Sequence, residues 1–210
     1  MKTPDTLEPK LRRAAIVPIV QPRSVDFVLQ LAEQLVEGGA EAIEIVMRSE
    51  AALSALEACR QRFPELLVGA GTILTTAHYD AAVNAGAQFG ISPGFLPALC
   101  EHAKKGPIQL VPGIQTASEV MAAQAAGFNL LKFYPSEPAG GTVVLADFAS
   151  IFTSVSFMPS GKIQQAHLAG YGKLRNITSV GGSWMYAEGS ADTVRDRMVA
   201  SLEAIRAARG

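Results

Sequence analysis

A lysine lies inside an apolar stretch of the sequence, in the segment "NLLKFYPSEPAG" at residues 129–140. Leu131 and Phe133 flank Lys132, so the segment has the pattern of a buried β-strand that contains one amine. Lysine is almost never fully buried without a partner or a chemical role. Either the Lys132 side chain extends to the surface, or the fold holds its amine inside for chemistry.

Two more ionisable residues share one face of another apolar strand, "AIEIVMRS". Side chains alternate along a strand, so Glu44 and Arg48 point to the same side, and in the lysine strand Lys132 and Tyr134 do the same. A structural ion pair would explain Glu44 and Arg48 if they stood alone. An inward lysine opposite them suggests chemistry instead.

The three side chains together suit a 2-keto acid substrate. An amine that is desolvated or close to another cation is disfavoured as its ammonium form, and the free amine attacks a ketone to form a Schiff base. The planar guanidinium of Arg48 matches a carboxylate with two parallel hydrogen bonds. Glu44 can carry protons to and from the carbinolamine and the neighbouring hydroxyl.

The elements that must position these residues alternate between strand and helix along the chain, which is typical of a parallel α/β sheet. Eight such units favour a single-domain (β/α)₈ TIM barrel over residues 14–210, preceded by an N-terminal extension over residues 1–13. The alternative is an open doubly wound sheet, which usually has a Gly-x-Gly-x-x-Gly turn after its first strand, whereas this chain has "VPIVQPRS" there. The predicted strands are residues 14–20, 42–47, 66–72, 88–93, 108–114, 130–135, 155–161 and 177–182.

In such a barrel the catalytic groups lie at or near the C-terminal ends of the strands. Gly69 and Gly71 are expected to leave room inside, and Thr72 ends its strand. Glycine turns also follow the seventh and eighth strands, in "FMPSGK" and "SVGGSW", where barrels frequently bind phosphate on backbone N–H groups. One glycine pair is weak support, but the two together favour a phosphorylated ligand bound by Gly161, Gly181, Gly182 and Ser183.

The composition excludes several classes of partner. A net charge of −1 provides no overall attraction for nucleic acid or an anionic membrane. No stretch approaches the ~18 apolar residues of a membrane span, and the N-terminal segment is a poor signal peptide, so we expect a cytoplasmic protein. Cys59 and Cys100 lack metal-ligand spacing, so no metal and no other cofactor is expected.

The strings "EIVMR", "GAGTIL", "ISPG", "VPGIQTASE", "KFYPSE" and "VGGSW" resemble the 2-keto-3-deoxy-6-phosphogluconate aldolases. These are class I aldolases that also include 4-hydroxy-2-oxoglutarate aldolase activity. The resemblance runs in order from about residue 14 to residue 186, and the combination of strings is highly specific. It implies a metal-independent (β/α)₈ homotrimer that acts on a small-molecule 2-keto acid.

The resemblance also implies a role for each matching residue. Lys132 would form the Schiff base with pyruvate, and Glu44 would accept and donate protons. The implied reaction cleaves a 6-phosphorylated 2-keto-3-deoxy sugar acid to pyruvate and glyceraldehyde 3-phosphate, with Glu44 taking the C4 hydroxyl proton as the C3–C4 bond breaks. The residues assigned to substrate binding are Arg48, Thr72, Pro93, Tyr134 and Ser160.

Two residues depart from the family pattern after the seventh strand, where "PSGK" replaces the usual "PTGG". Ser160 keeps a hydroxyl but lacks the methyl group of threonine, which leaves the stereochemical strictness open. Lys162 replaces a glycine that would lend its N–H to the phosphate. Its charge would clamp a dianion, or its side chain would crowd the turn, and the first alternative is favoured because a cation suits a dianion.

Other functions are also compatible with parts of this pattern. The same chemistry on 4-hydroxy-2-oxoglutarate or on the galactonate epimer is the nearest, although the galactonate relatives would have a polar amide near the position of Arg48. A phosphate-binding barrel isomerase or synthase would explain the glycine turns but not Lys132. A binding or scaffold barrel would need no inward ionisable trio, since buried charges are a weak source of stability.

Overall fold

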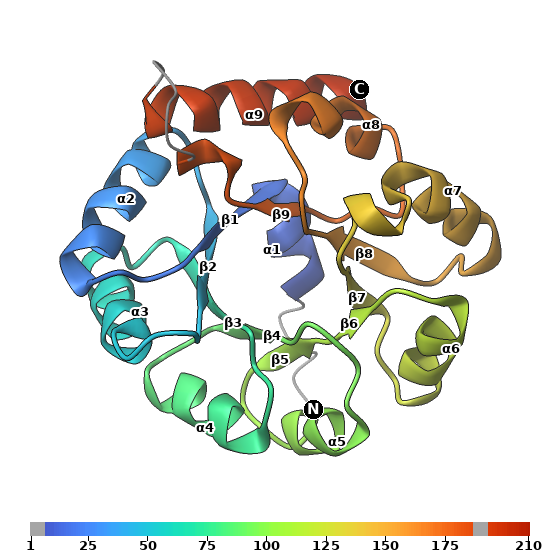
Figure 1. The fold of residues 1–210 in the computed structure, drawn as a ribbon, viewed down its shortest axis with the longest axis horizontal. Coiled ribbons are helices and arrows are strands. Elements are labelled where there is room, and N and C mark those ends of the chain that lie inside the picture. The colour runs from blue at the N-terminus through green and yellow to red at the C-terminus, as the bar shows by residue number, and fades with distance from the viewer. Residues whose placement is uncertain (1–6, 187–192) are drawn as a thin grey trace.

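The computed structural model describes residues 7–186 and 193–210, and in them strands and helices alternate (Figure 1). The strands are β1 (Ile16–Val20), β2 (Ala42–Val46), β3 (Leu67–Gly71), β4 (Phe89–Ile91), β5 (Gln109–Val111), β6 (Gly113–Ile114), β7 (Leu130–Phe133), β8 (Ser156–Pro159) and β9 (Val180–Gly182). The α-helices are α1 (Leu7–Ala14), α2 (Val25–Glu37), α3 (Ala52–Arg62), α4 (Thr76–Asn84), α5 (Pro97–Ala103), α6 (Ala117–Ala125), α7 (Gly141–Ile151), α8 (Leu168–Gly172) and α9 (Val194–Arg209). Short 3₁₀ turns are η1 (Glu137–Ala139), η2 (Gln165–His167) and η3 (Trp184–Tyr186).

The strands pair in parallel throughout the described residues and form a curled sheet. One part has the strand order β5-β4-β3-β2-β1-β9, and the other has the order β6-β7-β8. Isolated bridges from Phe157 to Ile177 and from Ser160 to Gly181 connect β8 with the segment that contains β9. Figure 1 shows the strands around a common centre with α2 to α9 outside them. The chain is therefore a single α/β domain with a curled parallel sheet.

The predicted strand at residues 108–114 is wrong in one respect, because the structure divides it at Pro112 into β5 and β6. Proline has no backbone N–H and cannot donate to a neighbouring strand. The carbonyl of Val111 still accepts from Ser92 N at 3.2 Å, whereas the carbonyl of Pro112 accepts from Lys132 N at 2.9 Å. The segment thus changes partner from β4 to β7 at the proline.

The predicted first and last strands both begin too early. Ala14 is the final residue of α1, and Ala15 has a φ of 62°, so β1 starts only at Ile16. The predicted strand at 177–182 is regular only from Val180, and Ile177 contributes a single bridge.

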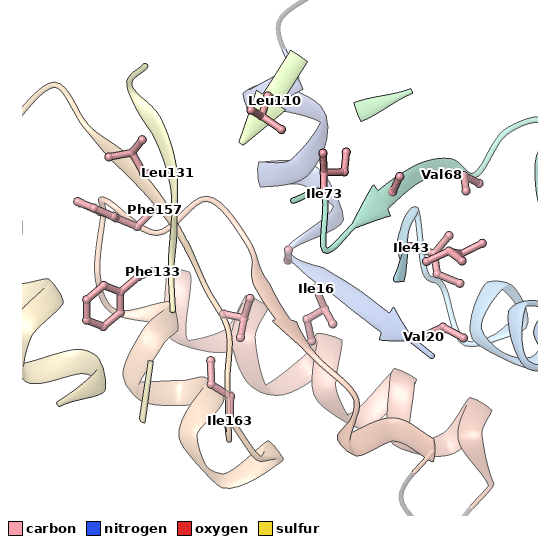
Figure 2. Packing of buried hydrophobic residues seen from close by; sticks show 14 of the residues in the cluster. Ile16, Val20, Ile43, Val68, Ile73, Leu110, Leu131, Phe133, Phe157 and Ile163 are labelled. Atoms are coloured by element: carbon pink, nitrogen blue, oxygen red, sulfur yellow. The ribbon is translucent and has the colours of Figure 1, made fainter. Parts of the chain in front are cut away.

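Apolar side chains pack on both faces of the sheet. Ile43, Ile45, Leu131 and Phe133 face the surrounding helices, as the alternation predicts. Figure 2 shows Leu131, Phe133 and Phe157 gathered on the same side of their strands. These residues belong to the larger of the two core clusters, and burying each removes apolar area from water.

A second apolar cluster fills the inside of the curled sheet. Leu7 and Leu11 of α1 pack there against Val17, Phe89 and Met158. Since α1 leads directly into β1, it closes the end of the sheet where the strands begin (Figure 1). Leu7 and Leu11 of the predicted N-terminal extension therefore join the core. Residues 1–6 lie outside the described residues, and the predicted domain boundary after residue 13 remains a prediction.

Two further features of the described residues bear on function. None of their helices combines the length and the apolar character needed to cross a membrane. Cys59 and Cys100 are free and buried, and burial raises the pKa of each thiol to about 11. At neutral pH both remain protonated, so they are packed thiols rather than nucleophiles.

Candidate active site

Lys132 lies in the middle of β7 and is held inside the sheet. Its side chain points away from the helices that cover Leu131 and Phe133, and the residue is 6% exposed. Its Nζ donates to Oε1 of Glu44 at 3.3 Å. The ring of Tyr134 also lies near, with its centroid 5.5 Å from Nζ. The Lys132 amine therefore does not extend to the surface. The fold holds it inside.

Glu44 supplies the carboxylate beside this amine from the centre of β2. The residue is fully buried, and its Oε2 accepts no hydrogen bond from any described residue. A carboxylate oxygen that is buried and unpaired is costly unless a ligand or a proton satisfies it. Glu44 Oε2 is thus available as an acceptor for a group on a bound molecule.

Gly71 makes the room that the Glu44 carboxylate occupies. A Cβ at Gly71 would clash with Oε1, Cδ and Cγ of Glu44, while a Cβ at Gly69 would clash with the Phe89 ring. The space that these two glycines were predicted to leave is therefore filled by one catalytic candidate and by one core side chain. Gly71 lacks a side chain because Glu44 needs that volume.

Replacing Gly71 with alanine is expected to displace the Glu44 carboxylate. We expect a loss of ~1–3 kcal/mol in the free energy of unfolding, typical of overpacking, together with a drop in kcat. Thermal unfolding and steady-state kinetics measure both effects. Gly94→Ala is the matched control, because a Cβ there meets nothing within 4 Å and should change neither quantity. Equal behaviour of the two variants would contradict this explanation of Gly71.

Arg48 and Thr72 lie together just past the ends of β2 and β3. Arg48 Nε donates to Thr72 Oγ1 at 3.1 Å, and Thr72 adopts a left-handed backbone with a φ of 59°. Because Thr72 Oγ1 accepts from Arg48, its own hydroxyl hydrogen is directed elsewhere. Together the pair offers the remaining guanidinium N–H groups and one hydroxyl, a donor set that fits a carboxylate.

The segment after β8 forms another part of the site. Ser160 is buried and its Oγ has no hydrogen-bond partner among the described residues. Gly161 has a φ of 104°, and a Cβ there would lie 2.9 Å from Pro135 Cα. Lys162 follows with a φ of 61°, in the left-handed region that glycine adopts at no steric cost. The lysine that replaces a glycine thus keeps a glycine-like backbone.

One cavity of about 330 Å³ brings these groups together. It opens at the C-terminal ends of β2, β3, β7, β8 and β9, where a site was expected. The predicted site residues that line it are Glu44, Arg48, Thr72, Pro93, Lys132, Tyr134, Ser160, Gly161, Lys162, Gly182 and Ser183.

Gly181 is the exception among the predicted residues, since it does not line the cavity. It lies inside β9, and a Cβ there would lie 3.1 Å from Ile19 and 3.2 Å from both Met158 and Ser160. Close packing between strands accounts for this glycine. The neighbouring Gly182 does line the cavity, and a Cβ there would clash with the Trp184 ring.

Sequence reasoning missed several lining residues. Tyr186 donates from its hydroxyl to the carbonyl of Ile19 at 2.6 Å, and burial raises the pKa of that phenol. Gln21 directly follows β1, so the rule that sites lie at strand ends contained a signal for it. The missed lining residues are Ile19, Gln21, Val46, Ile163, Gln164 and Tyr186.

The described residues contain no group of three or more histidine, cysteine or acidic side chains that could hold a metal ion. The chemistry that the cavity offers comes from its own amine, carboxylate, guanidinium and hydroxyl groups. A buried amine beside a carboxylate, with a carboxylate-binding pair at one end, suits covalent catalysis on a keto acid.

Comparison with known proteins supports the same chemistry. A model of the aldolase family "KDPG and KHG aldolase" matches residues 7–204. The "KHG/KDPG aldolase" of Escherichia coli (strain K12) is 37% identical over 175 residues, which covers 83% of this chain and 82% of the relative. A "2-dehydro-3-deoxy-phosphogluconate aldolase" of Treponema pallidum (strain Nichols) is 37% identical over 180 residues, 86% of each chain.

A solved structure extends the comparison to the fold. It is a KDPG aldolase from Legionella pneumophila with pyruvate captured as a covalent carbinolamine intermediate. The TM-score is 0.85 and the sequences are 33% identical, with 97% of this chain and 98% of the relative covered.

Proposed function

The chain belongs to the KDPG and KHG aldolase family, and on this premise we propose that it is a carbon–carbon lyase with a class I mechanism. The substrate is 2-dehydro-3-deoxy-6-phosphogluconate, and the products are pyruvate and glyceraldehyde 3-phosphate. The observation that carries the proposal is the buried Lys132 amine, 3.3 Å from a buried Glu44 carboxylate inside a cavity. A phosphate-binding isomerase or a scaffold protein has no use for this pair.

The first half of the reaction forms the Schiff base. The Lys132 ammonium transfers a proton to Glu44 over the 3.3 Å contact, and the free amine attacks the C2 ketone. The resulting carbinolamine receives a proton on its hydroxyl and loses water, which leaves an iminium that joins C2 to Nζ. Glu44 serves this step because its Oε1 already contacts the amine and its Oε2 is open to the substrate.

The second half breaks the C3–C4 bond. Glu44 accepts the proton of the C4 hydroxyl, the C4–O bond becomes a carbonyl, and the bonding electrons move through C3 to the iminium. The aldehyde product leaves, and the enamine on Lys132 is protonated at C3. Water then hydrolyses the iminium, which releases pyruvate and restores the amine.

Arg48 and Thr72 are proposed to hold the carboxylate of the keto acid. The guanidinium donates from the groups that its bond to Thr72 leaves free, and the Thr72 hydroxyl adds one more donor. This anchor at the ends of β2 and β3 places C2 over Lys132. Pro93 and Tyr134 are proposed to contact the same part of the substrate from the cavity wall.

The segment after β8 and the end of β9 are proposed to hold the distal, phosphorylated end of the substrate. Gly161, Lys162, Gly182 and Ser183 all line the cavity, and so does Ser160, which directly precedes Gly161 in the chain. The Ser160 hydroxyl, buried and unpaired among the described residues, is available to the aldehyde portion. Gly181, which lies outside the lining, is proposed to act only by allowing close packing of β9.

Replacing Lys162 with glycine tests the proposed phosphate clamp. We expect KM for the phosphorylated substrate to rise by about 2–5-fold, since an exposed ion pair contributes ~0.2–1 kcal/mol. The free energy of unfolding should rise by up to ~1 kcal/mol, because glycine relieves the left-handed backbone at some entropic cost. Steady-state kinetics and chemical denaturation measure the two effects. An unchanged or lower KM would favour the alternative in which Lys162 crowds the turn.

A coupled assay tests the function directly. Pyruvate released from 2-dehydro-3-deoxy-6-phosphogluconate is measured with lactate dehydrogenase, beside 4-hydroxy-2-oxoglutarate and the galactonate epimer as alternative substrates. The proposal requires the highest kcat/KM on the phosphorylated gluconate derivative. Higher kcat/KM on either alternative would keep the chemistry and change the substrate, and cleavage of none of the three would refute the proposal.

We also propose that the curled sheet is a closed (β/α)₈ barrel. Two features support closure. Bridges connect β8 with the segment that contains β9. At the other join, β5 belongs to one sheet and β6 to the other, and the two strands meet at Pro112. With β5 and β6 taken as one strand, the order runs continuously around the ring.

The protein is further proposed to be a cytoplasmic homotrimer that needs no cofactor and binds neither nucleic acid nor membranes. Family resemblance supports the trimer, and the net charge of −1 supports the absence of polyanionic partners. Light scattering after size-exclusion chromatography should give a mass three times that of the 22.1 kDa chain. A mass of one or two chains would contradict the trimer and leave the chemistry untouched.

A further inference from the structure

A mostly buried polar cluster lies directly behind the cavity wall that follows β8. It consists of Ser136, Glu137 and Tyr171, from the turn after β7 and from α8. None of the three lines the cavity, and none has a part in the mechanism proposed above. Ser136 and Tyr171 are fully buried and the Glu137 side chain is 28% exposed, so the cluster extends from the interior toward the surface.

The hydrogen bonds of the cluster have a fixed direction. The Tyr171 hydroxyl donates to Oε1 of Glu137, which accepts only, because a carboxylate carries no hydrogen. Since Tyr171 has a single hydroxyl hydrogen, the 2.7 Å contact with Ser136 requires Ser136 Oγ to donate to Tyr171. Burial and the neighbouring Glu137 raise the pKa of Tyr171, so this phenol stays protonated and keeps donating. The chain therefore runs from Ser136 through Tyr171 to Glu137.

Ser136 and Glu137 also hold the cavity wall through their backbone N–H groups. Ser136 N donates to the carbonyl of Ser160 at 2.7 Å, and Glu137 N donates to the carbonyl of Gly161 at 3.2 Å. A Cβ at Gly161 would lie 3.2 Å from Ser136 N, so the two segments touch without spare room. The positions of Ser160 and Gly161 thus depend on where Ser136 and Glu137 are held.

Glu137 also extends to the far end of the same wall. Its Oε2 lies 3.6 Å from Nδ1 of His167, and that nitrogen accepts from Gln164 N at 3.1 Å. Gln164 lines the cavity beside Lys162. The Glu137 carboxylate therefore accepts from Tyr171 of α8 and lies near His167 of η2, whose ring accepts from Gln164 N at the C-terminal end of the 160–164 segment.

The glycine pair in "PAGGT" has a role in this arrangement. A Cβ at Gly141 would lie 3.0 Å from Oε1 of Glu137 and 3.1 Å from the hydroxyl of Tyr171. Any larger residue would press on the bond between Glu137 and Tyr171. The absence of a side chain at Gly141 leaves room for the hydrogen bond between Tyr171 and Glu137.

From these contacts we infer that Glu137 and Tyr171 are positioning residues, which hold the 160–164 segment where it receives the distal, phosphate-bearing portion of the substrate. The inference rests on the proposed aldolase function. Neither residue touches Lys132 or the Arg48–Thr72 pair, so the pyruvate end of the site does not depend on them. Their loss should weaken binding of the phosphorylated substrate and leave Schiff-base formation with pyruvate intact.

The experiment compares Tyr171→Phe, Glu137→Ala and Glu137→Gln with the unaltered protein. Tyr79→Phe is the matched control, because Tyr79 is also buried and donates to the carbonyl of Ile108 at 2.6 Å, away from the cavity. For each protein we measure KM and kcat for 2-dehydro-3-deoxy-6-phosphogluconate, and separately the rate at which borohydride traps pyruvate on Lys132.

Tyr171→Phe and Glu137→Ala should each raise KM about tenfold, the effect of losing one hydrogen bond to a charged group. Glu137→Gln should restore most of the affinity, because its amide oxygen still accepts from Tyr171. Trapping of pyruvate should match the unaltered protein in all variants, and Tyr79→Phe should change neither quantity.

Two results would overturn the inference. One is a KM in Tyr171→Phe equal to that of Tyr79→Phe, and the other is a parallel fall in pyruvate trapping, which would mean general damage to the fold. Failure of the unaltered protein to trap pyruvate at all would refute the proposed function itself.

Discussion

Replacing Lys132 with arginine is expected to lower kcat/KM for cleavage by at least ~10⁴-fold, the scale seen when a covalent nucleophile is removed. Arginine keeps a positive charge beside Glu44, so the charge balance of the buried ion pair is preserved. It has no amine that deprotonates near neutral pH and cannot form a Schiff base. The coupled pyruvate assay measures the loss, and circular dichroism checks that the variant is folded.

Lys104→Arg is the matched control for this variant. Lys104 is paired with Glu101 at 2.6 Å on the protein surface, outside the cavity. We expect its kcat/KM to equal that of the unaltered protein. Retention of more than about a hundredth of the activity in a folded Lys132→Arg variant would be incompatible with covalent catalysis at this residue.

Replacing Glu44 with glutamine is expected to lower kcat strongly. The amide keeps the shape of the carboxylate in the space beside Gly71 and still accepts from Lys132 Nζ, but it no longer takes up a proton. A positioned general base typically contributes 10²–10⁴-fold, so kcat should fall by ~10²–10⁴. Rapid-quench measurement of substrate cleavage, with a time course of pyruvate trapping, shows whether both proton-dependent stages slow.

Glu41→Gln serves as its control, since Glu41 lies just before β2 and pairs with Arg13 at the surface. That variant should keep its kcat. If Glu44→Gln cleaved the substrate within about threefold of the normal rate, the proton acceptor would have to be another group, and the assignment of Glu44 would fail.

Local rules of the sequence were sufficient for the centre of the site. Alternation along a strand predicts that Lys132 and Glu44 point inward, and both do, because β7 and β2 are regular and buried on both faces. The preference of parallel α/β folds for sites at the C-terminal ends of strands predicts the cavity as well. The inward direction of Lys132 and of Glu44 depends only on neighbouring residues of each strand.

Features that join distant segments needed the structure. Arg48 lies past the end of β2, so its orientation follows from its bond to Thr72 on the next unit and not from alternation. Tyr171 and Glu137 are 34 residues apart, and no local pattern pairs them. The role of Gly71 is also non-local, because only the register between β2 and β3 brings it against Glu44.

Contacts between distant segments also account for the errors in element boundaries. A run of apolar residues predicts one strand at 108–114, but the proline inside it changes the pairing partner between β5 and β6. The N-terminal segment lacks a long apolar run, and its packing inside the sheet depends on just Leu7, Leu11 and Ala14 on one face of α1. Three such residues give too weak a periodic signal in the sequence.

Trapping with pyruvate and sodium borohydride tests whether Lys132 is the nucleophile. The unaltered protein is reduced in the presence of pyruvate, digested, and mapped by peptide mass spectrometry beside Lys132→Arg. We expect one reduced adduct, on the peptide that contains Lys132, and none in the variant. No adduct, or an adduct on a surface lysine such as Lys104, would contradict this expectation and would leave Lys132 and Glu44 as a structural ion pair.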